Sequence, residues 1–303
     1  MNALKLRLEL MNKSSYWLRL NTLLFCVITW HLGSSYLCSL MFPLLAHAPT
    51  IEVLATLTPQ QILSIQTIKS LSVFIIAPLS YLSLFEKNNQ VIRLQWRHGY
   101  VRSMTTLFIL MSSCCIVNVR LLQWNQAITL PYWLHAFEVW ARTTEANLHV
   151  LLARITAFNS IQALGIGMCV LGVIPAVGEE LLFRGLIQHF LQCAMHNRHA
   201  AIGISSLLFS ALHFQFYALV PRWLLGGLLG YIYIWTEDLR FPIMGHLLSN
   251  VLGLLLIFIQ RHYGLTNLFS PLQSLSAWLG ALFVAVFATY SLRRQSRQYL
   301  YTM

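Results

Sequence analysis

The segment 171–185 reads LGVIPAVGEELLFRG, and it decides the architecture because Glu179, Glu180 and Arg184 lie inside an apolar run. Ionisable side chains at membrane depth are costly, so they mark either a functional site or a specific ion pair. Two later apolar segments carry further polar residues, namely Phe209 with His213, and His246 with Asn250. Together these groups predict one polar site inside a helical bundle.

The composition is that of an integral membrane protein. Of the 303 residues 57% are hydrophobic and only 10% are charged, with a mean hydropathy of +0.63, whereas soluble domains have about 25% charged residues. Apolar runs of about 20 residues predict helices and not barrel strands. We therefore expect an all-α, polytopic transmembrane bundle of about eight helices. The expected spans are 17–41, 66–86, 103–123, 160–190, 200–220, 223–237, 241–260 and 274–292.

We divide the chain into two regions. Residues 1–158 form an N-terminal membrane region of about three spans plus an interfacial segment at 132–149, where aromatic and charged residues alternate. Residues 159–303 form a catalytic membrane core with a C-terminal span. The six cysteines lie in or beside apolar runs without a CxxC pair, so they indicate packing and neither a disulfide frame nor a zinc site.

The net charge of +11 is concentrated beside the apolar spans and does not indicate nucleic-acid binding. Basic residues gather in the N-terminal segment, in the loop 87–102 and in the C-terminal tail, while the loop 46–64 has none. The positive-inside rule then predicts cytoplasmic termini and an even number of spans. We expect a multi-pass protein of a bacterial cell (inner) membrane, with the polar cavity opening to the cytoplasmic side.

The two glutamates have different expected roles. Glu180 and Arg184 are i,i+4 neighbours on a helix and can form a buried ion pair. Glu179 projects about 100° away and has no such partner on its own helix. A carboxylate without a partner can act as a general base. We therefore assign a structural role to Glu180 and a catalytic role to Glu179.

The two histidines follow on the next apolar segments. His213 lies one turn after Phe209, inside the expected span 200–220. It follows His199 by about 14 residues, the same count by which Glu179 precedes Cys193, so the acid and the imidazole should lie at similar depth. His246 and Asn250 share one face of the seventh span. They either hold neighbouring helices together or donate to a developing oxyanion.

Taken together, the three motifs resemble those of the CPBP family, which includes CAAX prenyl proteases and bacteriocin-processing, Abi-type enzymes. Its EExxxR, FxxxH and HxxxN/D motifs occur here in the same order, within about 166–259. The resemblance implies a glutamic-type intramembrane endopeptidase. Glu179 and His213 would activate water, while His246 and Asn250 would form the oxyanion hole. Glu180, Arg184 and Phe209 would support the site.

The same resemblance leaves alternatives. One Glu, two His and one Asn could hold zinc with a water, although no HExxH is present, so we expect a mechanism without a cofactor. A non-catalytic immunity or scaffold protein of the family and a proton pathway are further hypotheses. The expected partners are the lipid bilayer and a membrane-associated peptide or protein. The sequence does not distinguish prenylated termini, leader peptides and C-terminal sorting signals as substrates.

Overall fold

The computed structural model describes residues 2–42, 56–86, 92, 100–264 and 274–301. All regular elements in these ranges are helical. The chain therefore folds as the expected all-α polytopic bundle, and seven of its helices are long and apolar enough to cross a membrane.

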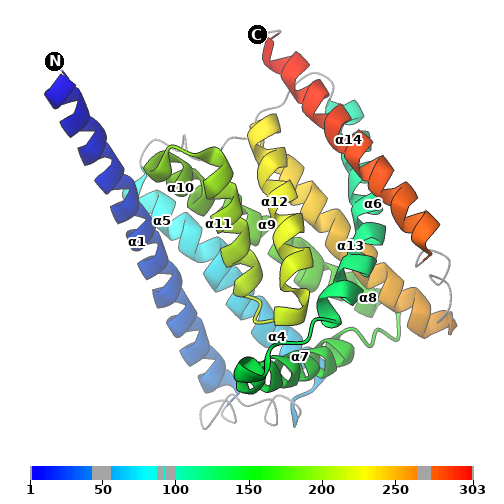
Figure 1. Ribbon diagram of the computed structural model, residues 1–303. Coiled ribbons are helices and arrows are strands. Elements are labelled where there is room, and N and C mark those ends of the chain that lie inside the picture. Colours follow the sequence, from blue (N-terminus) through cyan, green and yellow to red (C-terminus); the bar gives the residue numbers. More distant parts are fainter. Residues whose placement is uncertain (1, 43–55, 87–91, 93–99, 265–273, 302–303) are drawn as a thin grey trace.

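The N-terminal half supplies three of these long helices and one further helix that lies across the end of the bundle. The helix α1 covers Asn2–Met41, and α4 (Pro59–Ser70) continues through the π-helix η1 (Leu71–Ile76) into α5 (Ala77–Phe85). The helix α6 covers Tyr100–Gln126. The short 3-10 turn η2 (Tyr132–Leu134) leads into α7 (His135–Ile155), which lies across one end of the bundle (Figure 1).

The C-terminal half begins with one long, continuous helical rod. It runs through α8 (Ile161–Gly167), η3 (Met168–Val173), α9 (Ile174–Glu180), η4 (Leu181–Ile187) and α10 (Gln188–Met195). The helix α11 (Arg198–Ala211) leads through the 3-10 turn η5 (Phe216–Ala218) to α12 (Leu219–Thr236). The last two helices are α13 (Arg240–Tyr263) and α14 (Leu275–Tyr301).

One expected span is shorter than predicted. The range 200–220 contains α11, which ends at Ala211 after 14 residues. Such a helix is about 21 Å long, less than the roughly 30 Å of a hydrocarbon core. It nevertheless packs against α12. The beginning of α1 and the end of α14 lie at the same end of the bundle, opposite α7 (Figure 1).

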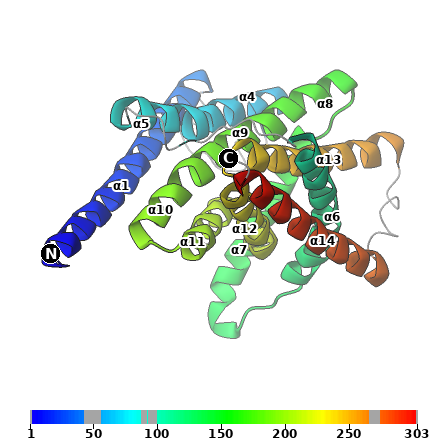
Figure 2. The same ribbon diagram turned by 90° about the horizontal axis from the view of Figure 1, so that it is seen from above.

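Two apolar clusters flank the middle of the bundle. One joins α1, α5, η4 and α10, and includes the buried Leu23, Tyr81 and Leu186. The other joins α6, α12, α13 and α14, and includes Leu107, Met111 and Leu229. Seen along the bundle, α1 and α14 lie on opposite flanks with α10, α11 and α12 between them (Figure 2). Helices from both predicted regions pack against one another, and the division at residue 158 stays a prediction.

Gly178 shows why the second long helix lies so close to the site. A Cβ atom at this position would lie 2.6 Å from Cβ of Phe74 and 3.1 Å from its carbonyl oxygen. Only a residue without a side chain allows η1 and α9 to approach this closely. The region 59–85 is thereby held directly against the segment that carries the glutamates.

Candidate active site

The glutamate pair lies on α9 between two π-helical segments, η3 and η4. Pro175, in the first turn of α9, lacks the N–H that an α-helical ladder requires. Each π segment adds residues to a turn and so changes the direction in which the following side chains point, and such segments are frequent at functional sites. Glu179 is 8% exposed and Glu180 is fully buried.

Glu180 forms the predicted pair with Arg184. Nη1 of Arg184 donates to Oε1 of Glu180 at 2.7 Å, and Nη2 donates to the carbonyl oxygen of Gly226 at 3.1 Å. A Cβ atom at Gly226 would lie 3.2 Å from Nη2, so this glycine makes room for the guanidinium. The spacing of Gly226 and Gly230 on α12 thus serves close contact between helices.

Glu180 also binds His246, which the sequence did not indicate. Nδ1 of His246 lies 2.8 Å from the same Oε1 atom that accepts from Arg184. A carboxylate paired with arginine can only accept, so Nδ1 carries a proton. The other ring nitrogen, Nε2, lies 3.9 Å from Oε2 of Glu179, too far for a direct hydrogen bond. Glu180 therefore fixes the imidazole so that Nε2 faces the second carboxylate.

His213 lies in a turn and not inside a helix. The helix α11 ends at Ala211, and Phe214 adopts a left-handed conformation with φ of 54°. Nδ1 of His213 donates to the carbonyl oxygen of Phe209 at 2.8 Å, because a carbonyl can only accept. This bond leaves Nε2 of His213 as an acceptor in the neutral ring.

Phe209 connects the two histidines with the ion pair. Its ring centroid lies 5.0 Å from that of His213 and 5.8 Å from that of His246, in edge-on geometries. The guanidinium of Arg184 lies over the ring at 4.7 Å from the centroid. Phe209 therefore supports three polar side chains at once through ring contacts.

The four predicted catalytic residues line one cavity of about 370 Å³. Glu179, His213, His246 and Asn250 all line this space, so the structure brings together the four side chains predicted to be catalytic. Nδ2 of Asn250 donates to the carbonyl oxygen of Gly172 in η3 at 3.4 Å, which orients the carboxamide and leaves its second N–H available.

Comparison with known protein families agrees with this arrangement. The model of the Rce1-like family, described as type II CAAX prenyl endopeptidase, matches residues 161–252. This segment, called the CAAX-type segment below, is similar to that protease family. The match begins at α8 and ends just after Asn250, so it contains all three motifs. No curated protein and no solved structure matches the chain.

The cavity of the CAAX-type segment extends toward α7. Its wall includes Leu152 of α7 and, on α13, residues from His246 down to Ile257. The helix α13 runs from the end that holds the chain termini to the end that holds α7 (Figure 1). The lining residues thus lead toward the end opposite the termini, and the expectation that the cavity opens on the side of the termini stays a prediction.

Two lining residues were missed by sequence reasoning. Gln66 of α4 and Ser249 of α13 both face the cavity. Gln66 lies in a region without a recognisable motif, and only its polarity in an apolar span could have drawn attention to it. Ser249 lies between His246 and Asn250 in the sequence, and it was not predicted because it is not part of their i,i+4 pattern.

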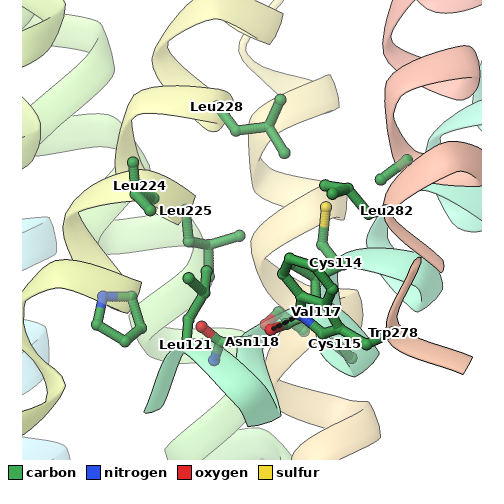
Figure 3. Close-up of a pocket in the computed structure, with 13 residues that line it drawn as sticks. Cys114, Cys115, Val117, Asn118, Leu121, Leu224, Leu225, Leu228, Trp278 and Leu282 are labelled. Carbon is green, nitrogen blue, oxygen red and sulfur yellow. Dashed lines mark hydrogen bonds between the residues drawn. The ribbon is translucent and has the colours of Figure 1, made fainter. Parts of the chain in front are cut away.

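A second cavity, of about 330 Å³, lies on the other side of Ser249. Leu224, Leu225 and Leu228 of α12 face Trp278 and Leu282 of α14 across it, with residues 114–121 of α6 completing the wall (Figure 3). The lining is almost entirely apolar, and the acids and histidines of the CAAX-type site do not take part in it. This space has the chemistry of a hydrocarbon pocket and not of a catalytic centre.

The acids and histidines of the cavity are of the residue types that bind metal ions. Within the described ranges, no three His, Cys, Asp or Glu side chains are grouped so that they could hold a metal ion. The Nδ1 atoms of both histidines are already occupied by protein acceptors, and Oε1 of Glu180 serves Arg184 and His246. Metal-bound histidines commonly donate their other ring N–H to such acceptors, so the expectation of a mechanism without a cofactor stays a prediction.

Proposed function

We propose that the protein is an intramembrane endopeptidase that hydrolyses a peptide bond near the terminus of a membrane-associated substrate. The observation that carries the proposal is the convergence of Glu179, His213, His246 and Asn250 on one cavity within the segment that matches the CAAX endopeptidase family. A buried acid, an imidazole acceptor and two N–H donors around one space are the groups that acyl transfer to water requires.

In this mechanism Glu179 and His213 activate the attacking water molecule. A water molecule between them donates one hydrogen bond to the carboxylate and one to Nε2 of His213. As the water oxygen attacks the carbonyl carbon of the substrate, Glu179 takes a proton and a C–O bond forms. The same carboxyl group then passes that proton to the leaving nitrogen as the C–N bond breaks.

The oxyanion is held by His246 and Asn250. Because Nδ1 of His246 donates to Glu180, an N–H at Nε2 requires the doubly protonated imidazolium. Glu180 and Glu179 flank this ring and balance its charge, as Arg184 balances Glu180. The imidazolium Nε2–H and the free N–H of Asn250 then donate to the oxyanion.

Substitution of the catalytic groups tests this function. Glu179→Gln and His213→Ala should abolish cleavage without changing expression, since each removes a group that activates water. His246→Ala and Asn250→Ala should each lower the rate about 100- to 1000-fold, the usual effect of losing an oxyanion donor. Mass spectrometry of membrane peptides from cells with the wild type and with Glu179→Gln would identify the substrate. A scaffold protein would retain its function in the Glu179→Gln variant.

The orientation of the bundle is part of the proposal. We place both termini in the cytoplasm, because the segments at that end carry most of the lysines and arginines. The α7 end, toward which the cavity extends, then faces the opposite side of the membrane.

A further inference from the structure

Arg222 is a cation whose charge interacts with those of Glu179 and His213, and it has no role in the proposed chemistry. It lies in the first turn of α12, nine residues after His213 in the chain and on the α7 end of the bundle. Its side chain is partly buried, and among the described residues no carboxylate forms an ion pair with it. An ionisable side chain at membrane depth without an ion pair is a candidate for ligand binding.

The hydrogen-bonding capacity of Arg222 is largely unused. Nη2 donates to the neutral amide oxygen of Gln215, while Nη1 is buried and has no hydrogen-bond partner among the described residues. A guanidinium has five N–H donors and binds carboxylates through two parallel bonds. An unpaired buried donor is costly, so a ligand that satisfies it gains correspondingly in affinity.

The acidic side chains around Arg222 either interact with other residues or belong to the catalytic site. Glu145 accepts from the backbone N–H of Tyr217 at 3.0 Å and lies 3.9 Å from His149. Glu138 pairs with Arg142 at 2.8 Å. The charge that acts most strongly on Arg222 is that of Glu179, and Arg222 also acts on His213. The guanidinium therefore lies within electrostatic reach of the reacting groups.

We infer that Arg222 binds a carboxylate of the peptide substrate, on the leaving-group side of the bond that is cut. The inference rests on the proposed endopeptidase function, in which a bond near a substrate terminus is hydrolysed. A peptide cut close to its C-terminus carries its α-carboxylate only a few residues from the scissile bond. A planar, bidentate cation within electrostatic reach of Glu179 and His213 is suited to bind that group and so to set the distance from the terminus to the cut.

The test compares two forms of one probe. A dansylated hexapeptide of glycine and leucine is made with a free C-terminal acid and with a C-terminal amide. Its binding to the purified Glu179→Gln protein, which cannot cleave it, is measured by fluorescence anisotropy. The acid should bind about 10- to 100-fold more tightly than the amide, as expected for a charged hydrogen-bonded pair. Adding Arg222→Gln should bring the acid to the level of the amide and leave the amide unchanged.

Controls separate specific binding from general charge effects. Arg261→Gln removes an exposed arginine at the same end of the bundle, one that donates to the carbonyl of Ala153, and should leave the preference intact. Arg222→Met, which keeps the aliphatic stem, replaces Arg222→Gln if the latter does not fold. Nanodiscs with and without phosphatidylglycerol test lipid phosphate as the source of the anion.

Three results would overturn the inference. They are equal binding of acid and amide, equal weakening of both by the Arg222 substitution, and no binding of either at millimolar concentration. An effect of Arg222 that depends on phosphatidylglycerol but not on the peptide terminus would assign the residue to lipid and also overturn it. Failure of the proposed function is a separate result, namely membrane peptides that are the same with the wild type and with Glu179→Gln.

Discussion

Glu180 binds two neighbours through a single oxygen atom. Oε1 accepts from Arg184 at 2.7 Å and from His246 at 2.8 Å, while Oε2 is buried without a partner among the described residues. The residue therefore joins two helices, α9 and α13, and sets the orientation of a catalytic side chain. Its role extends beyond the structural one expected from the i,i+4 pattern.

Substitution of Glu180 should affect both stability and rate. Glu180→Gln leaves Arg184 buried without its counter-charge, which costs about 3–5 kcal/mol when a buried pair is broken. It also weakens the bond that holds His246, so kcat should fall about 100-fold while KM changes little. Thermal unfolding in detergent and steady-state kinetics measure the two effects. A variant that loses stability but keeps kcat would restrict Glu180 to the ion pair.

Chelation decides between the two forms of the mechanism. If water is activated by Glu179 and His213 alone, activity should survive exhaustive treatment with a zinc chelator and should not rise on addition of zinc. The measurement is the rate of cleavage before and after chelation, with metal content determined on the same sample. Activity that is lost on chelation and restored by zinc would make the four cavity residues candidate ligands and would contradict the roles proposed here.

At the scale of helices, the sequence predicted spacing well and helix shape less well. The pair Glu180–Arg184 follows from regular helical geometry and is found, and Glu179 and His213, expected at similar depth, line the same cavity. The π segments on either side of α9 and the end of α11 at Ala211 were not predicted, because they depend on which backbone groups neighbouring helices satisfy. The bond between Glu180 and His246 spans 66 residues and has no local signal.

Close approach of η1 and α9 provides a prediction for one glycine. Gly178→Ala would place its Cβ atom 2.6 Å from Cβ of Phe74, so the two helices must move apart, at a cost of about 1–3 kcal/mol. Activity should fall with stability, because α9 carries Glu179. The matched control is Gly165→Ala in the same helical rod, where nothing lies within 4 Å. That substitution should be neutral or stabilising by up to about 1 kcal/mol, and equal thermal unfolding of the two variants would contradict the argument.

At the scale of the whole molecule, the chain termini and the cavity lie toward opposite ends of the bundle. The beginning of α1 and the end of α14 share one end of the bundle, whereas the residues that line the cavity lead to α7 at the other end. If basic segments face the cytoplasm, the substrate reaches Glu179 from the opposite side of the membrane. Such access suits a peptide that has already crossed the membrane better than a terminus exposed in the cytoplasm.

Cysteine labelling tests this sidedness directly. In a background without the six native cysteines, Gln66→Cys reports the cavity, Ala146→Cys reports α7 and Gln298→Cys reports the tail. A membrane-impermeant maleimide is added to spheroplasts. It should label Gln66→Cys and Ala146→Cys directly, and Gln298→Cys only after permeabilisation. The reason is that the bilayer separates the two ends of the bundle, whichever way it is inserted. Labelling of Gln66→Cys and Gln298→Cys from the same side would show that the cavity opens toward the termini. Labelling of only Gln298→Cys from outside would show the reverse orientation, in which cytoplasmic substrates have access to the site.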